Sequence, residues 1–181
     1  MKIIGLSDIH GDIRYISGIE NEIKSADLVL IAGDITHFGY SPEAENIISA
    51  IMEINKNIFS ITGNCDNKSV AEYIENIGIS AEGKEVYYRP LDLKILGFGG
   101  SVSTPVNTPN TFPESVFLDF FSSIESSPDI LLTHQPPYNT SSDRVMGMKH
   151  VGSPAIKAFL DDKKPRLCLC GHIHESISAD Y

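Results

Sequence analysis

Residues 2–8 read KIIGLSD, residues 27–34 read DLVLIAGD, and residues 57–64 read NIFSITGN. Each stretch is a short apolar run that ends in polar residues, the pattern of a buried strand. Isoleucines recur between these runs at near-helical spacing: Ile13, Ile16, Ile19, Ile23, and then Ile47, Ile48, Ile51, Ile54. The alternation of strands and helices favours an α/β fold with a largely parallel sheet and helices on its outside.

Capping residues predict where the helices begin and end. Ser41-Pro42 reads as an N-cap followed by proline at the first helical position. Ser69 and Glu72 have the spacing of a capping box, and Gly78 is expected to end that helix.

The second half of the chain predicts a different arrangement. Residues 85–100 read as two strands of an antiparallel hairpin that turns near Pro90 and Asp92. The remaining expected elements are a helix near 114–125, a strand from Asp129, a helix starting at Ser153-Pro154, and a strand at 166–170. Two long loops, 101–113 and 135–152, are expected to carry function. No linker or repeat interrupts the sequence, so residues 1–181 are expected to form one domain.

Composition limits the classes of function. The chain has 181 residues, 41% of them apolar, and it lacks an apolar stretch of the roughly 18–20 residues that cross a membrane. An N-terminus without a signal peptide and three cysteines, an odd number, predict a reducing, cytoplasmic setting. A formal net charge of −10 argues against binding polymeric nucleic acid. If the protein handles phosphate, a bound metal is the natural source of positive charge.

Polar residues that can bind metal follow the predicted strands. They are Asp8, His10, Asp34, Asn64, His134, His172 and His174. The carboxyl ends of parallel strands share one edge of a sheet, so these side chains are expected to meet there. Carboxylate, amide and imidazole ligands suit Mn²⁺, Fe, Co²⁺, Ni²⁺ or Zn²⁺, and seven of them suit two ions that share a carboxylate. Taken singly, an Asp after a strand is more often a turn former, and His-x-His is as often a surface or core pair.

The order of these motifs resembles the calcineurin-like metallophosphoesterases. The motifs are D-x-H (Asp8, His10), G-D (Gly33, Asp34), G-N-x-D (Gly63, Asn64, Asp66), a lone His (His134) and G-H-x-H (Gly171, His172, His174). The resemblance implies a four-layer α-β-β-α sandwich with two divalent metal ions, Mn²⁺ favoured, at the strand ends. Asp8, His10 and His174 would hold one ion, Asn64, His134 and His172 the other, and Asp34 would bridge them.

The resemblance also implies an activity. A hydroxide bridging the two metals would attack a phosphate ester, with Asp34, Asn64, Cys65, Asp66 and His134 in the catalytic site. Many members carry a histidine where this chain has Cys65, and a neutral thiol is a weak donor. We therefore expect a phosphodiesterase acting on a small phosphorylated molecule such as a nucleotide.

Three further expectations complete the interpretation. Arg144 and His150 are candidate substrate contacts together with Asn64, although a packing or capping role suits His150 equally well.

Tyr181 comes seven residues after His174, so the final strands of the family's fold are expected to be missing. Their absence would leave a sheet edge that a partner or a second copy covers. The alternatives to a phosphodiesterase are a non-catalytic protein-binding scaffold of the same fold and a single-metal hydrolase of another reaction type.

Overall fold

The computed structural model describes residues 1–103, 107–146 and 149–176. Parts of the two long loops predicted to carry function, 104–106 and 147–148, lie outside the described residues, and so do residues 177–181. The expectation about the end of the chain at Tyr181 therefore falls outside them too.

A three-stranded parallel sheet is built from the first half of the chain. Its strands are β1 (Ile3–Leu6), β2 (Leu28–Ala32) and β3 (Ile58–Ile61), in the order β1-β2-β3. All five residues of the central strand β2 are buried, because a strand covered on both faces has no exposed side. The predicted parallel strands are confirmed.

Four helices of the described chain pack on this sheet, and the sequence predicted only some of their bounds correctly. They are α1 (Arg14–Gly18), α2 (Glu20–Lys24), α3 (Ser41–Ile54) and α4 (Lys68–Asn76). The single helix expected over the first isoleucines is wrong, because Ile19 leaves the helical conformation and separates α1 from α2.

The predicted caps are also partly wrong. The N-cap of α3 is Tyr40, one residue before Ser41. The N-cap of α4 is Asn67, and the Ser69 hydroxyl accepts a hydrogen bond from the Ser41 amide at 3.2 Å, so the two hydroxyl residues serve a contact between helices. Gly78, with φ of 78°, follows α4 as predicted.

A second, mixed sheet contains the later strands. Its members are β4 (Lys84–Tyr88), β5 (Leu93–Phe98), β8 (Ile130–Thr133) and β11 (Leu167–Leu169), in the order β11-β8-β5-β4. β4 and β5 form the expected antiparallel hairpin around the short helix η1 (Arg89–Leu91), and the other pairs are parallel. α5 (Glu114–Ser123) and α6 (Pro154–Lys163) complete this half, and the Ser153 hydroxyl caps α6 by accepting from the Ile156 amide at 3.2 Å.

The two long loops contain short paired strands that the sequence did not indicate. β6 (Ser101–Val102) pairs with β7 (Thr111–Phe112) in parallel. The short helix η2 (Ser141–Asp143) leads into β9 (Arg144–Val145), which pairs antiparallel with β10 (Lys149–His150). The described parts of these loops therefore contain short regular elements between irregular segments.

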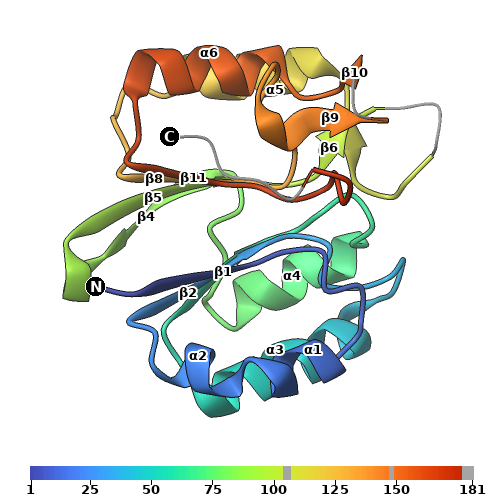
Figure 1. Ribbon diagram of the computed structural model, residues 1–181, viewed down its shortest axis with the longest axis vertical. Helices are drawn as coiled ribbons and strands as arrows, with labels where there is room; N and C mark the ends of the chain where they lie inside the picture. Colours follow the sequence, from blue (N-terminus) through green and yellow to red (C-terminus); the bar gives the residue numbers. More distant parts are fainter. Residues whose placement is uncertain (104–106, 147–148, 177–181) are drawn as a thin grey trace.

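Three apolar clusters lie between four layers of secondary structure. The first cluster joins α1–α4 to one face of β1-β2-β3, the second fills the space between the two sheets, and the third joins α5 and α6 to the outer face of the second sheet. Alternate residues of β2 serve different clusters: Val29 and Ile31 face the helices, whereas Leu28 and Leu30 face the other sheet. Figure 1 shows the resulting order, helices, sheet, sheet, helices. The predicted α-β-β-α sandwich is confirmed.

A groove follows the free edges of two strands. β1 and β11 each pair on one side only within the described chain, and Gly5 of β1 lies against Leu169 of β11. The groove, with a volume of about 1110 Å³, is lined by residues of both strands together with Leu160 and Pro165.

Among the described residues, every helix is too short or too polar to cross a membrane.

Candidate metal centre

The seven residues predicted to bind metal lie together past the carboxyl ends of the strands. β1 leads to Asp8 and His10, β2 to Asp34, β3 to Asn64, β8 to His134, and β11 to His172 and His174. Figure 1 shows these ends at the same side of both sheets. The contacts below join all seven into one group.

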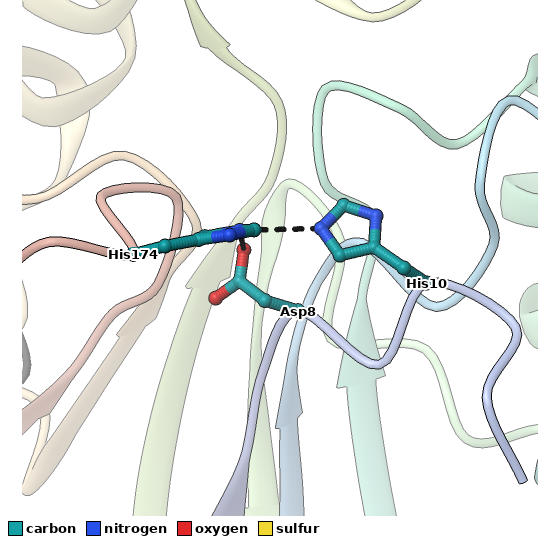
Figure 2. A group of neighbouring side chains, drawn as sticks. All are labelled: Asp8, His10 and His174. Carbon is teal, nitrogen blue, oxygen red and sulfur yellow. Dashed lines mark hydrogen bonds and ion pairs between the residues drawn. The ribbon is translucent and has the colours of Figure 1, made fainter.

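One cluster consists of Asp8, His10 and His174. The Nε2 atoms of the two histidines are 3.2 Å apart, and Asp8 Oδ1 is 3.1 Å from His174 Nε2 (Figure 2). Their donor atoms all lie within 4.8 Å of one another. Asp8 is held from behind, since its carboxylate accepts hydrogen bonds from the Ser7 hydroxyl and the His172 amide.

A second cluster forms around the fully buried His134. Its Nδ1 lies 2.8 Å from the Ala32 carbonyl oxygen and donates to it, so in the neutral ring the lone pair is on Nε2. That nitrogen faces Asn64 Oδ1 at 3.0 Å. The ring of His172 packs against His134 with centroids 5.2 Å apart.

Asp34 lies between the two clusters. Its Oδ2 is 3.7 Å from His10 Nε2, and its Oδ1 is 3.5 Å from His134 Nε2. Burial opposes ionisation of this carboxyl, but His134 and the Cys65 amide, which donates to Oδ1 at 2.8 Å, outweigh it and hold its pKa well below the ordinary value. Asp34 is therefore an anion that both clusters contact.

His172 is kept neutral by its surroundings. Burial, reinforced by the neighbouring His134 ring, lowers the pKa of His172 to about 4. A neutral imidazole is the form in which histidine binds metals.

The donor set fits divalent cations. His134 Nε2 faces an amide oxygen and a carboxylate oxygen, so this nitrogen must carry a proton or a cation. Burial lowers the pKa of His134, but Asp34 outweighs burial and the pKa is raised, which favours the proton in the metal-free protein; a divalent cation would take the place of that proton. The facing nitrogens of His10 and His174 lie beside Asp8 in a similar group, and the other ring nitrogen of His10 is buried with no partner among the described residues. Mixed carboxylate, amide and imidazole donors match divalent transition metals.

Cys65 is a buried thiol beside this group. It is 7% exposed, and its sulfur lies 3.4 Å from the Asn64 side-chain amide. Burial, together with the charge of Asp34, raises the pKa of Cys65 far above its ordinary value. The thiol thus stays protonated, which argues against Cys65 as a nucleophile.

Asp66 binds the backbone of the loops that carry Asp34 and Asn64. Its carboxylate accepts hydrogen bonds from the amides of Ile35, Thr36 and Gly63 and from the Thr36 hydroxyl, at 2.8–3.2 Å. Burial raises the pKa of Asp66, and these donors oppose the rise. With its oxygens used in this way and 1% of its surface exposed, Asp66 joins the Asp34 loop to the Asn64 loop, so we assign it a positioning role.

The backbone at the centre is unusually close-packed. A Cβ on Gly63 would lie 2.0 Å from Asp34 Oδ1, so only glycine fits at that point. Asp8, His10, Asp34 and His172 all have left-handed φ, between 49° and 75°. Residues other than glycine seldom adopt this conformation. Where they do, they are often found at functional sites.

Two of the three predicted substrate contacts, Arg144 and His150, face each other across the short hairpin of β9 and β10. The hairpin is bound to the segment that follows His174. The Ser176 hydroxyl exchanges hydrogen bonds with the Arg144 amide and carbonyl, and the Glu175 carboxylate accepts from the Met146 amide at 2.8 Å. The Arg144 side chain is exposed.

Asp143 is a buried residue that the sequence interpretation missed. Its fully buried carboxylate accepts from the amides of Asn139, Thr140 and Gly152 at 3.0–3.1 Å, and from His150 Nδ1 at 2.5 Å. Thr140 and Asp143 also form a capping box at the start of η2. That spacing was the available signal, because Thr140-x-x-Asp143 has the capping-box pattern.

Comparison with known proteins agrees with this geometry. The family model for calcineurin-like phosphoesterases matches residues 1–176, a range that includes every residue of the candidate metal centre. An uncharacterized protein of Methanocaldococcus jannaschii is 35% identical over 188 residues, an alignment that covers 99% of this chain and 83% of that protein.

Proposed function

Because this chain belongs to the calcineurin-like phosphoesterases, we propose that it hydrolyses phosphodiesters of small molecules with two divalent metal ions bound at the strand ends. Metal-dependent phosphoester hydrolysis is the chemistry of the family.

The observation that carries the proposal is the position of Asp34. One of its oxygens approaches His10 and the other approaches His134, and each of these histidines belongs to a separate donor cluster. In the proposed assignment Asp8, His10 and His174 hold one ion. Asn64, His134 and His172 hold the other, and Asp34 contacts both. Mn²⁺ is the favoured metal, and Fe, Co²⁺, Ni²⁺ and Zn²⁺ suit the same ligands.

The metals and the protein contribute different chemistry. When bound, the ions supply positive charge for the phosphoryl oxygens and a source of hydroxide at neutral pH. Such charge is needed because the chain itself carries a formal net charge of −10. We propose that the side-chain NH2 of Asn64 orients the ester while its oxygen and His134 hold metal, and that Arg144 and His150 contact the remainder of the substrate from the hairpin.

The direct test is hydrolysis of bis(p-nitrophenyl) phosphate by the purified protein with Mn²⁺, with and without a chelator, alongside a count of bound metal. We expect chelator-sensitive hydrolysis and two tightly bound equivalents. One equivalent would support a single-metal hydrolase instead, and two equivalents without hydrolysis of any phosphoester would support a protein-binding scaffold.

Cys65 is proposed to set the preference for diesters. A basic leaving group needs a proton as its P–O bond breaks, and the buried thiol is a poor source of one. The phenolate released from phenyl phosphate needs that proton more than the p-nitrophenolate released from bis(p-nitrophenyl) phosphate. We expect Cys65→His to raise the monoester-to-diester ratio of kcat/KM by about ten-fold or more, since acid–base catalysis contributes roughly 10²–10⁴-fold. The measurement compares phenyl phosphate with bis(p-nitrophenyl) phosphate, and Cys65→Ser, similar in size to the natural residue, is the control. An unchanged ratio in Cys65→His would show that this position does not set the preference.

A further inference from the structure

Two exposed rings stand beside the candidate metal centre, His37 and Phe38, which we call the aromatic rim. The His37 ring contacts the ring of His10 edge to face, with centroids 5.4 Å apart and an interplanar angle of 75°. The Phe38 ring contacts His37 in the same manner, at 5.0 Å and 71°. Phe38 is 45% exposed. A continuous series of rings therefore runs from a proposed metal ligand to an open apolar surface.

The fold holds Phe38 in a conformation that a bulky residue rarely adopts. Its φ is 59°, in the left-handed region, which is strained for a residue other than glycine. Asn67, the residue directly after the G-N-C-D motif, donates from its side-chain amide to the carbonyls of Phe38 at 3.0 Å and Gly39 at 2.8 Å. The strain at Phe38 is thus maintained by a side chain that adjoins the metal-binding motif.

The His37 backbone is fixed as well. Its amide donates to the Glu43 carboxylate at 3.1 Å, and a Cβ on Gly39 would lie 1.8 Å from the other oxygen of Glu43. The segment from His37 to Gly39 is therefore clamped from α3 on one side and by Asn67 on the other. The backbone that carries the Phe38 ring is thus preorganised, and the ring packs on His37, so little ordering is needed for it to contact a planar group.

The chemistry of the rim indicates what it contacts. Phe38 has no polar atom on its side chain, so its exposed face binds organic groups by apolar contact and stacking, or cations through the π-face. A phosphoester bound at the metal centre would bring its organic group next to the rim. Nucleobases stack on aromatic side chains because every base has a flat π-face.

We propose that the aromatic rim stacks on the base of a nucleoside phosphodiester, which makes Phe38 a specificity-determining residue. This inference rests on the proposed function, since it takes the phosphate to be bound at the metal centre. It adds a substrate class, esters that carry a nucleoside.

The test compares two diesters with the same leaving group, thymidine 5′-(p-nitrophenyl phosphate) and methyl p-nitrophenyl phosphate, each with the Mn²⁺-loaded protein. Phe38→Gly removes the ring and suits the positive φ, so it is expected to fold. We expect Phe38→Gly to raise KM for the thymidine ester by about five-fold or more and to leave KM for the methyl ester unchanged. Phe38→Tyr, which keeps the ring, is expected to restore the natural KM. The matched control is Tyr87→Leu, which removes another exposed ring, on β4.

The outcomes separate the two proposals. Hydrolysis of neither ester by the natural protein would overturn the proposed function and with it the rim. If both esters are hydrolysed with the same KM, and Phe38→Gly does not change it, the proposed function stands and the proposal for the aromatic rim is overturned. An equal rise in KM for both esters would also overturn it, because a general disturbance of the loop does not distinguish a base from a methyl group.

Discussion

Asp34→Asn is expected to lower kcat/KM for bis(p-nitrophenyl) phosphate by about a thousand-fold or more, and to reduce tightly bound metal from two equivalents to at most one. The substitution keeps the shape of the side chain and removes the charge that both donor clusters contact. Metal stabilisation of the transition state is worth several kcal/mol, and each 1.36 kcal/mol is a factor of ten in rate. The measurements are steady-state kinetics with Mn²⁺ and elemental analysis of the purified variant.

Asp34→Asn is expected to affect folding as well as metal binding. Burial opposes the charge of Asp34, but His134 and the Cys65 amide outweigh it and lower the pKa, so the charge stabilises the metal-free fold and its removal is expected to lower the free energy of unfolding. Urea unfolding of the metal-free variant measures that part, and the kinetics are compared where both proteins are folded. Asp119→Asn is the matched control, because Asp119 is exposed on α5, in the layer that packs on the second sheet. Two equivalents of metal and near-natural activity in Asp34→Asn would show that Asp34 does not bridge the ions.

Asp143→Ala is expected to lower the free energy of unfolding by about 3 kcal/mol at neutral pH. The change leaves three backbone amides and the His150 ring without their acceptor, and each buried unsatisfied donor costs about 1–3 kcal/mol, in part recovered where water enters. Asp143→Asn keeps one acceptor oxygen and is expected to lose less. Urea unfolding of all three proteins, metal-free, measures the effect, and a loss below about 1 kcal/mol in Asp143→Ala would contradict it.

The contribution of Asp143 is also expected to depend on pH. Burial raises its pKa, but the His150 ring and the amides of Gly152, Asn139 and Thr140 outweigh burial, and the net pKa in the folded protein is lowered. A lowered folded pKa gives stability that is present above the unfolded value of about 3.9 and is lost as the pH falls through the folded value. The difference in unfolding free energy between the natural protein and Asp143→Asn should therefore shrink below about pH 4. A difference that stays constant from neutral pH down to pH 3 would show that the Asp143 charge is not involved.

Much of the fold follows from local sequence. The apolar runs predict the parallel strands, and the 85–100 stretch predicts the hairpin of β4 and β5, because periodicity and turn residues act over short distances. The errors arise where tertiary contacts decide the outcome. Ser69 bonds to the neighbouring helix at Ser41 instead of capping its own, and Ile19 breaks a helix whose apolar spacing continues.

The candidate site likewise has features that the sequence predicts and features that it does not. Its convergence was predictable in part, because the carboxyl ends of parallel strands share one edge of a sheet, but the strands lie in two sheets, β1, β2 and β3 in one and β8 and β11 in the other. The supporting roles of Asp66 and Asn67 were not predictable, because they depend on the path of the backbone through loops. The ligand assignments themselves stay predictions until metal is counted in the variants.

The left-handed backbone at Asp8, His10, Asp34 and His172 has a thermodynamic consequence. Each such residue costs roughly 1 kcal/mol, and the folded chain carries that cost whether or not a cation is present. This cost lowers the free energy of unfolding of the metal-free protein. In return, the metal-binding residues are already in position before a cation binds. By linkage, added divalent metal should raise the melting temperature in proportion to the logarithm of its concentration, and the apoprotein should be the less heat-resistant form.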